Sequence, residues 1–348
     1  MQTVVIGKNQ QVLRDVCLPV QGSVLTRVGQ FVNQGDLIAE SRLPESFEVI
    51  DIAAHFRVSP QQAGSFIKRL VGDVIGKGDV LAQKDGFITQ LYRSPGDGKV
   101  VSLREGRITI ALGQQKNQVY APAPGTVVEI LPNRGAVMAF RGSVIEGAWT
   151  NGVSAQGDLL FVEDIDKFGF AVTGPSVKDK IIALKKSATA IQLRRLLRLK
   201  PTGIVLPGLQ SEMISLVAES DVAVMSLLGF GDFSADPLSL ALFEVMKDKS
   251  AYIIAQKDVD GCELRPVLFN PESEVADLGF FKKETKLEVG AKVRLRGHPY
   301  TGIVGVVKEL PEAMDVFASG LKSKVAVIEC DDSQMIRASL KNIDLIVE

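Results

Sequence analysis

The chain has 348 residues, a length that a single hydrophobic core seldom serves, so two or three domains are expected. Hydrophobic residues make up 46% and charged residues 23% of the chain, which excludes a wholly disordered protein. The 40 basic and 41 acidic residues give a formal net charge of −1, which excludes binding to nucleic acid or anionic membranes through overall positive charge.

The three cysteines, Cys17, Cys262 and Cys330, are widely separated and include no C-x-x-C pair. This spacing argues against a disulfide framework or a zinc ribbon, and it fits a reducing compartment. Residues 1–8 lack the features of a secretory signal, and no apolar run has the length of a membrane-spanning helix. We therefore expect a cytoplasmic protein that has no membrane partner and no bound metal.

An internal repeat organises the first 150 residues. Residues 28–39 match residues 71–82 at a constant offset of 43 positions, and both copies contain a Val-Gly pair followed by a Gly-Asp pair. A second element, Pro-x-x-Gly-x-Val, begins at Pro19, Pro95 and Pro122. Each Gly-Asp pair permits a turn with positive φ between β-branched residues, so this part of the chain is predicted to form short β-hairpins.

These motifs resemble the biotinyl/lipoyl-carrier type of barrel-sandwich hybrid, and the resemblance implies such a domain over residues 1–150. Carriers of this family hold a modified lysine at a hairpin tip, in E-T-D-K-A or A-M-K-M contexts. The only lysine between Asp79 and Pro95 is Lys84, which lies in neither context. We therefore predict an unmodified chain whose barrel-sandwich fold is used for docking.

Residues 45–70 form a helix-turn-helix-like insertion in this predicted domain. Ser59 is the expected N-cap and Pro60 the first residue of the second helix, with Phe66, Ile67 and Leu70 directed inward. Two interpretations stay open, one being a structural plug. The other is a DNA reader that presents Gln61, Gln62, Ser65 and Lys68 to base edges.

Residues 165–270 alternate between strand and helix patterns and predict a small, Rossmann-like α/β domain with a parallel sheet covered on both faces. The expected strands are 180–184, 203–206, 222–227 and 251–255, and the expected helices are 189–199, 211–219 and 237–247. Right-handed crossovers bring the loops 207–211 and 229–233 together at the carboxyl edge of the sheet, where ligands usually bind. The ligand-binding candidates are Gly208, Gln210, Ser211, Gly229, Phe230, Gly231 and Asp232.

Residues 178–200 carry eight basic side chains and one acidic side chain. On the helix within this segment, Ile191, Leu193, Leu196 and Leu197 compete for the buried side. The other side carries Arg194, Arg195 and Arg198. Either this is a solvated helix face, or it binds an anionic partner such as a nucleic-acid backbone or an acidic protein.

Residues 286–348 contain V-G-x-x-V-R-L from Val289 to Leu295, followed by P-Y-x-G-x-x-G-x-V from Pro299 to Val307. These motifs resemble the KOW module of ribosomal proteins and transcription elongation factors, which implies a separable SH3-like barrel that binds RNA or protein. Arg294, Arg296 and Tyr300, together with His298, are the candidate partner contacts.

The sequence predicts a mixed multidomain chain: a mainly-β barrel-sandwich hybrid with a helical insertion, a small α/β domain and a C-terminal SH3-like KOW barrel. No nucleophile and base, cofactor motif or metal-ligand spacing is visible, so the first interpretation is a non-enzymatic scaffold or adaptor that binds a protein partner through its barrel domains. The second is a nucleic-acid-associated factor, related to transcription or translation, that uses the KOW-like barrel and the basic helix. The third is a small-molecule sensor or enzyme at the carboxyl edge of the α/β sheet. The sequence leaves the oligomeric state open.

Overall fold

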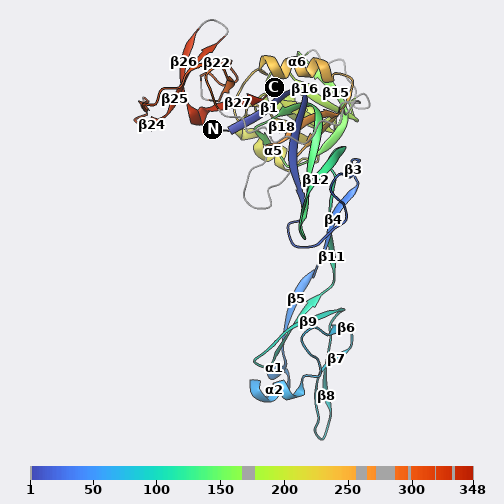
Figure 1. The fold of residues 1–348 in the computed structure, drawn as a ribbon. Coiled ribbons are helices and arrows are strands. Elements are labelled where there is room, and N and C mark those ends of the chain that lie inside the picture. The colour runs from blue at the N-terminus through green and yellow to red at the C-terminus, as the bar shows by residue number, and fades with distance from the viewer. Residues whose placement is uncertain are drawn as a thin grey trace. The chain divides into compact units, whose positions relative to one another are not determined.

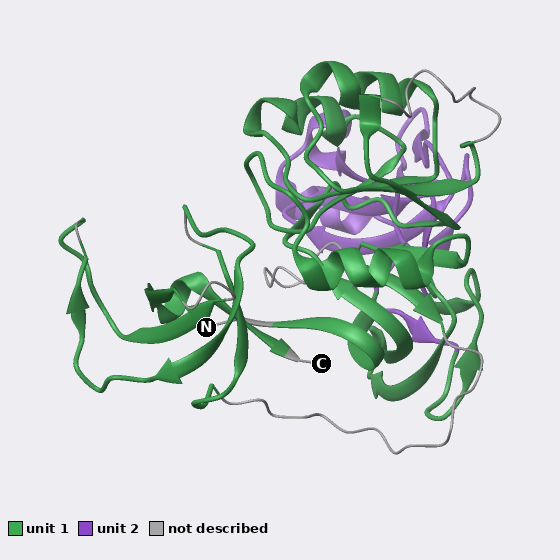
Figure 2. Ribbon diagram, turned by 90° about the horizontal axis from the view of Figure 1, so that it is seen from above, with its two compact units in different colours: residues 1–17, 26–38, 120–348 green, residues 18–25, 39–119 purple. Residues whose placement is uncertain are grey.

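The computed structural model describes residues 2–166, 177–255, 265–271, 287–296, 299–317, 319–330 and 334–347. The chain divides into two compact units, coloured separately in Figure 2. Unit 1 comprises residues 1–17, 26–38 and 120–348, and unit 2 comprises residues 18–25 and 39–119. Residues 1–150 are thus divided between both units. Among the described residues, no helix has the length and apolar character needed to cross a membrane.

Most of the regular structure is β, as predicted, and unit 1 contains one large mixed sheet. Its strands are hydrogen-bonded in the order β14-β18-β17-β16-β15-β19-β20-β13-β1-β27-β21-β22-β25-β26, and β12 joins β13 to β3. Figure 1 labels most of these strands. Their bounds are β1 Gln2–Cys17, β3 Phe31–Val32, β12 Gly125–Leu131, β13 Gly135–Glu146, β14 Trp149–Thr150, β15 Ala155–Val162, β16 Lys180–Leu184, β17 Gly203–Leu206, β18 Ala223–Ser226, β19 Ser250–Ile254, β20 Val267–Pro271, β21 Lys292–Leu295, β22 Val304–Glu309, β25 Val325–Cys330, β26 Met335–Ser339 and β27 Ile343–Val347.

The α/β part of unit 1 contains the parallel strands β15, β16, β17 and β18. Its helices are α4 (Ala190–Arg198), α5 (Ile214–Ala218, after the 3-10 turn η2 at Ser211–Met213) and α6 (Pro237–Met246). Side chains that alternate along β16 enter two different apolar cores: Ile181 packs with residues of α6, and Ile182 with residues of α4 and α5. The sheet is therefore covered on both faces, as predicted.

The expectation of a wholly parallel sheet is wrong at its last strand. β19, the strand predicted at 251–255, pairs antiparallel with β15. After α6 the chain turns at Asp248 (φ 58°), whose N–H donates to the carbonyl of Leu159 in the middle of β15. The chain therefore enters β19 there and runs toward the N-terminal end of β15. β15 itself begins at Ala155, before the predicted first residue of the α/β domain.

The C-terminal strands β21, β22, β25, β26 and β27 surround a separate apolar core that includes Val293, Val307 and Leu345. Two short strands, β23 (Asp315–Val316) and β24 (Lys322–Ser323), pair with one another, and the 3-10 turn η3 spans Leu340–Asn342. β27 pairs antiparallel with β21 and parallel with β1, so the C-terminal segment shares its sheet with the start of the chain.

A buried charge cluster also joins the C-terminal strands to the α/β part. Arg294 on β21 is 1% exposed and lies 3.3 Å from a carboxylate oxygen of both Asp236 and Asp344. Asp344 on β27 also pairs with Arg265 at 2.8 Å and with Arg296 at 3.2 Å. Asp236 is the N-cap of α6, where its carboxylate accepts the Ser239 N–H, as expected for a residue before Pro237. The cluster therefore fixes β21 against the beginning of α6.

Unit 2 is built from short strands and two short helices. A four-stranded sheet has the order β5-β10-β9-β6, a hairpin is formed by β7 and β8, and a three-stranded sheet has the order β11-β4-β2. The bounds are β2 Ser23–Val24, β4 Leu37–Leu43, β5 Ser46–Asp51, α1 Ile52–Phe56, α2 Pro60–Phe66, β6 Val74–Ile75, β7 Val80–Lys84, β8 Gln90–Arg93, β9 Gly98–Arg104, β10 Arg107–Leu112 and β11 Gln115–Tyr120. The core of unit 2 includes Phe56, Ala63, Ile75, Leu81 and Ile108.

The helical insertion begins as predicted. Ser59 caps α2 in a reciprocal capping box with Gln62, and Pro60 is the first helical residue. The inward orientation expected for Leu70 is wrong, because α2 ends at Phe66 and the chain is extended from Ile67 onward. Leu70 is consequently 73% exposed, whereas Phe66 and Ile67 pack against the core of unit 2.

The two copies of the repeat have the same backbone structure, one in each unit. The N–H of Gly29 donates to Val127, and the equivalent Gly72 donates to Val100, both at 2.8 Å. β3 pairs with the Pro122 element through Val32 and Gly125. β6 pairs with the Pro95 element through the equivalent residues Ile75 and Gly98. Each repeat hairpin is therefore completed by its own Pro-x-x-Gly-x-Val strand.

Candidate functional site

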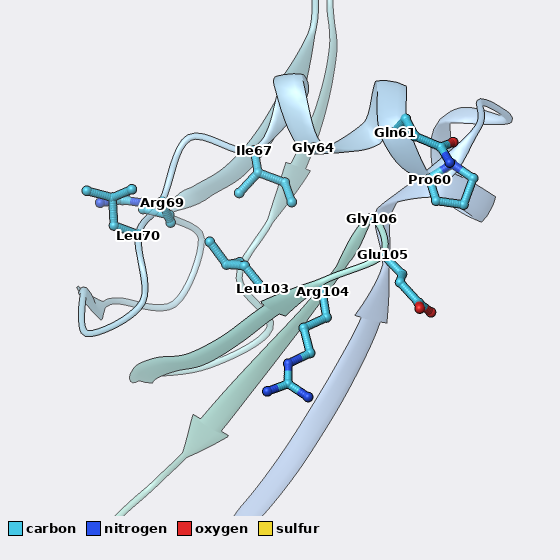
Figure 3. A pocket seen from close by; sticks show the side chains of 10 residues that line it. All are labelled: Pro60, Gln61, Gly64, Ile67, Arg69, Leu70, Leu103, Arg104, Glu105 and Gly106. Carbon is cyan, nitrogen blue, oxygen red and sulfur yellow. The ribbon is translucent and has the colours of Figure 1, made fainter.

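A groove of about 470 Å³ lies in unit 2 between α2 and the turn that joins β9 to β10 (Figure 3). One wall comes from α2 and the extended segment after it, and the other from the end of β9. The lining residues are Pro60, Gln61, Gly64, Ile67, Arg69, Leu70, Leu103, Arg104, Glu105 and Gly106.

Gly106 fixes the distance between the two walls. Its φ of 71° is in the left-handed region, and a Cβ at this position would come within 2.9 Å of the Ala63 Cβ. The carbonyl of Gly106 accepts the N–H groups of Ile52 and Ala53 at the start of α1. The close approach and the two hydrogen bonds hold both short helices against the β9–β10 turn.

Aliphatic side chains form the inside of the groove. Ile67 and Leu103 point toward one another from opposite walls, and both pack against the core of unit 2 (Figure 3). Leu70 stands at the rim, where the N–H of its own backbone donates to the Asp73 carboxylate at 2.9 Å. This exposed leucine continues the apolar lining outward, so the groove suits an apolar side chain of a binding partner.

The groove is lined by three charged residues, Arg69, Arg104 and Glu105. Arg69 is held by an ion pair with Asp79 at 3.0 Å and by a hydrogen bond from Nε to the Val80 carbonyl. Arg104 is exposed and has no ion pair in unit 2, every residue of which is described. Arg104 extends away from α2 along the sheet, and Glu105 points away from Leu103 on the other side of the turn (Figure 3).

One carboxyl group close to these elements has a shifted pKa. The pKa of Asp51 is lowered from 3.8 because its carboxylate accepts the Ala54 N–H as the N-cap of α1, and because Arg107 donates to it at 3.0 Å. Within the described ranges, no three His, Cys, Asp or Glu side chains lie close enough together to hold a metal ion.

The structure brings together the two loops predicted at the carboxyl edge of the α/β sheet. The N–H of Leu209 donates to Gly229, and the N–H of Gly231 donates back to Leu209, both at 3.0 Å. A Cβ at Gly208 would collide with the carbonyl of Gly231, so Gly208 permits this contact. Phe230 packs against Trp149. Gln210 precedes the 3-10 turn that Ser211 begins. Several of the predicted ligand residues thus have a packing role.

Asp232 lies at a cavity of about 510 Å³ beside these loops, at the carboxyl ends of β15 and β16. Lys185 faces Glu163 there at 3.6 Å, and the Gln192 amide donates to Asp166 at 2.6 Å. Lys185, Glu163, Gln192 and Asp166 were not among the predicted ligand residues. The signal that points to them is their position directly after two parallel strands.

The basic helix face is present on α4. Arg194, Arg195 and Arg198 are exposed, as predicted. Ile191 was expected to compete for the buried side but is 79% exposed, because Leu193 and Leu196 occupy the apolar core. Ile191 therefore shares the exposed face with the three arginines, at positions i, i+3, i+4 and i+7.

The three contact candidates of the C-terminal segment do not form one exposed patch. The prediction that Arg294 contacts a partner is wrong, because its guanidinium is buried in the charge cluster. Arg296 donates to the Lys341 carbonyl at 2.8 Å, and Tyr300 packs against the core of the C-terminal strands. His298 lies outside the described residues.

Lys84 is engaged by its own unit, since its Nζ donates to the carbonyl of Phe56 at 3.1 Å. The tip of the β7–β8 hairpin instead exposes Phe87 and Ile88.

The chain matches no protein-family model, and no curated protein is similar to it in sequence. Its function is therefore inferred from its own residues.

Proposed function

We propose that this chain is a non-enzymatic scaffold or adaptor, acting in the cytoplasm, that binds a protein partner through its β-rich modules. The observation that carries the proposal is the groove of unit 2, where Ile67 and Leu103 line the inside and Leu70 is displayed at the rim. A preformed concave surface with partly buried aliphatic side chains inside and an exposed leucine at its rim is typical of sites that bind a macromolecule.

The proposal includes two domain identities. We propose that the repeat-containing residues form a barrel-sandwich hybrid and residues 286–348 an SH3-like KOW barrel. The matched hydrogen bonds of Gly29 and Gly72 support the first, and the separate core of the C-terminal strands supports the second. An experimental structure tests both, since a repeat hairpin without its Pro-element strand, or an open C-terminal sheet, would contradict them.

Affinity purification from the native host tests the adaptor function. The bait is the full-length protein, compared with Leu70→Arg and with Ile191→Arg, which makes the same change on the exposed face of α4. A true partner is retained by the wild type and by Ile191→Arg and is lost with Leu70→Arg, and the purified pair then binds directly. An identical set of proteins on all three baits would refute binding through the groove.

A nucleic-acid-associated factor is the second candidate, favoured by the exposed face of α4 with Arg194, Arg195 and Arg198. Positive residues in the last turn also stabilise a helix through its dipole, which explains Arg195 and Arg198 without bound nucleic acid. Binding of mixed RNA and duplex DNA is measured across a salt series. A steep loss of affinity with salt that disappears in Arg194→Glu supports this candidate, and no binding at low salt removes it.

A further inference from the structure

The last part of one edge of β9 has no strand partner within unit 2, and this part lies beside the groove. β10 pairs with β9 from Gly98 to Arg104, with a bulge at Val101, which has no partner in the register. On the other side β6 pairs only with Gly98 and Lys99, and hydrogen bonds with Gly72 and Asp73 extend the contact to Val100. No strand of unit 2 pairs with Val101–Arg104 on that side.

We infer that this open edge and the groove together receive an extended segment of a partner protein, which adds to β9 as a further strand and alternates apolar with acidic side chains. The inference rests on the proposed adaptor function and names the kind of segment that the groove takes. An open strand edge supplies backbone donors and acceptors for such a segment, and a neighbouring pocket selects its side chains.

The apolar half of the alternation follows from the inside of the groove. Successive side chains of a strand point to opposite faces of the sheet, so every second side chain of the added strand faces the layer that contains Ile67 and Leu103. These two side chains pack against the core of unit 2, and Leu70 extends the apolar surface to the rim. Aliphatic side chains are therefore favoured on this face.

The acidic half follows from the opposite face. Lys99 pairs in register with the exposed Val74, so its side chain lies on the outer face of the sheet. The bulge at Val101 shifts the alternation along β9 by one residue, so Arg104 lies on the same outer face as Lys99 and extends along the sheet away from α2 (Figure 3). Neither side chain has an ion pair within unit 2. Carboxylates on the outward positions of an added strand would face these two cations, which favours an acidic segment over a basic one.

The first copy of the repeat shows which other residue this turn accepts at the position of Leu70. The residue equivalent to Leu70 is Arg27, which lies before the same turn in unit 1. An arginine is thus compatible with this turn. Since Leu70 is mostly exposed, Leu70→Arg should preserve the fold of unit 2 while placing a charge at the apolar rim.

The test titrates the full-length protein into a labelled, capped peptide of alternating valine and glutamate and follows fluorescence anisotropy. A peptide with the same composition but grouped valines, a helix-forming acidic peptide, and a peptide of alternating valine and lysine are the comparison probes. We expect the valine/glutamate peptide to bind best and to lose about tenfold or more in affinity with Leu70→Arg or Arg104→Glu. Ile191→Arg is the matched control and should not change the affinity.

Two further measurements locate the peptide and test the charge preference. Amide hydrogen exchange should slow within Val101–Arg104 when the peptide binds, at the alternate N–H groups that point away from β10, because the open edge gains hydrogen-bond partners. The double variant Lys99→Glu/Arg104→Glu should prefer the valine/lysine peptide. Melting temperatures of all variants should match that of the wild type, which separates loss of binding from loss of folding.

Unchanged affinity in the variants, equal binding of the grouped or helical peptide, or protection at another strand would overturn the inference. If no peptide binds while Leu70→Arg still releases the host partner, the adaptor function stands and the extended acidic occupant is wrong. If the host partner is also retained by Leu70→Arg, the adaptor function through this groove fails as well.

Discussion

The two copies of the repeat share a backbone and differ in their surroundings. Gly29 bonds to Val127, almost a hundred positions away, whereas Gly72 bonds to Val100 within the same small unit. Both copies leave their first valine, Val28 or Val71, 60% exposed. The residue immediately before the motif is Arg27 in the first copy and, in the second, Leu70, which is exposed at the rim of the groove. The repeated motif therefore specifies a hairpin and its partner strand, while residues outside the motif make one copy a candidate binding site.

The units that contain the two copies also differ in what holds them together. Unit 2 encloses a core of apolar side chains drawn from a single stretch of chain. Unit 1 gathers segments from both ends of the chain, and Arg294, Asp236 and Asp344 form a buried charge cluster among them. Substitutions that act on one unit alone test whether the two units unfold independently.

The largest expected effect is that of Arg294→Met on unit 1. The substitution removes the only cation paired with the buried carboxylate of Asp236 in the described part of the chain, and breaking such a buried pair costs about 3–5 kcal/mol. Denaturant unfolding is followed by the fluorescence of Trp149, the single tryptophan of the chain, which lies in unit 1. Hydrogen exchange at Ile108 and Ile110 reports on unit 2, which should keep its stability.

Arg296→Met is the control for this experiment, because Arg296 is partly exposed and its partner Asp344 keeps two other arginines. Its cost should be about 1 kcal/mol or less. Equal destabilisation of both units by Arg294→Met would show that they unfold together.

The next effect concerns the glycine of the Pro-x-x-Gly-x-Val strand. A Cβ at Gly98 would overlap the carbonyl oxygen of Ala111, and a Cβ at Gly125 would lie 2.8 Å from that of Ala139. Gly98→Ala should therefore destabilise unit 2 by about 3 kcal/mol, and Gly125→Ala should destabilise unit 1 by about 1–2 kcal/mol. The same probes measure both. If Gly125→Ala destabilises its unit more than Gly98→Ala does, the backbone of unit 2 adjusts more easily to the added Cβ than the backbone of unit 1.

The third pair of substitutions should affect both units alike. Gly35 and Gly78 have φ values of 83° and 87°, and neither has a neighbouring atom within 4 Å of an added Cβ. Gly35→Val and Gly78→Val therefore act through backbone strain alone, at about 1–3 kcal/mol each. Melting curves that match the wild type in either variant would show that the turn at that copy tolerates a branched side chain.

Several elements could be predicted from the sequence because local chemistry decides them. The caps Ser59 and Asp236 precede proline at the first helical position, and the repeat glycines mark turns with positive φ. The direction of β19 could not be predicted, because its pairing with β15 depends on where the chain returns after α6. Apolar strand patterns indicate burial and do not encode direction.

The candidate site was less predictable than the fold. Leu70 was assigned to a buried helix face because the apolar spacing continues past Phe66, where the helix in fact ends. Arg294 was a candidate partner contact because it lies in the KOW-like motif, but the two carboxylates that permit its burial, Asp236 and Asp344, lie far away in the sequence. The ion pair with Asp236 also argues against the expected independent folding of residues 286–348, because a fragment of these residues would contain Arg294 without Asp236.

The smallest expected effect is a pH dependence confined to unit 2. The pKa of Asp51 is lowered from 3.8, chiefly by the Ala54 N–H and then by Arg107, so its carboxylate stabilises the folded state at neutral pH. This contribution is complete well above pH 3.8 and is lost as the pH falls through the lower folded-state pKa.

Asn is also a good N-cap, so Asp51→Asn keeps the cap and removes the titrating charge. The wild type should exceed Asp51→Asn in unit 2 stability at pH 7, and the difference should disappear once the pH is below the lowered folded-state pKa. It should also shrink in high salt, because the group is exposed. A difference that persists at low pH would assign the effect to the geometry of the cap, and a change in the unfolding of unit 1 would show that the charge acts beyond its own unit.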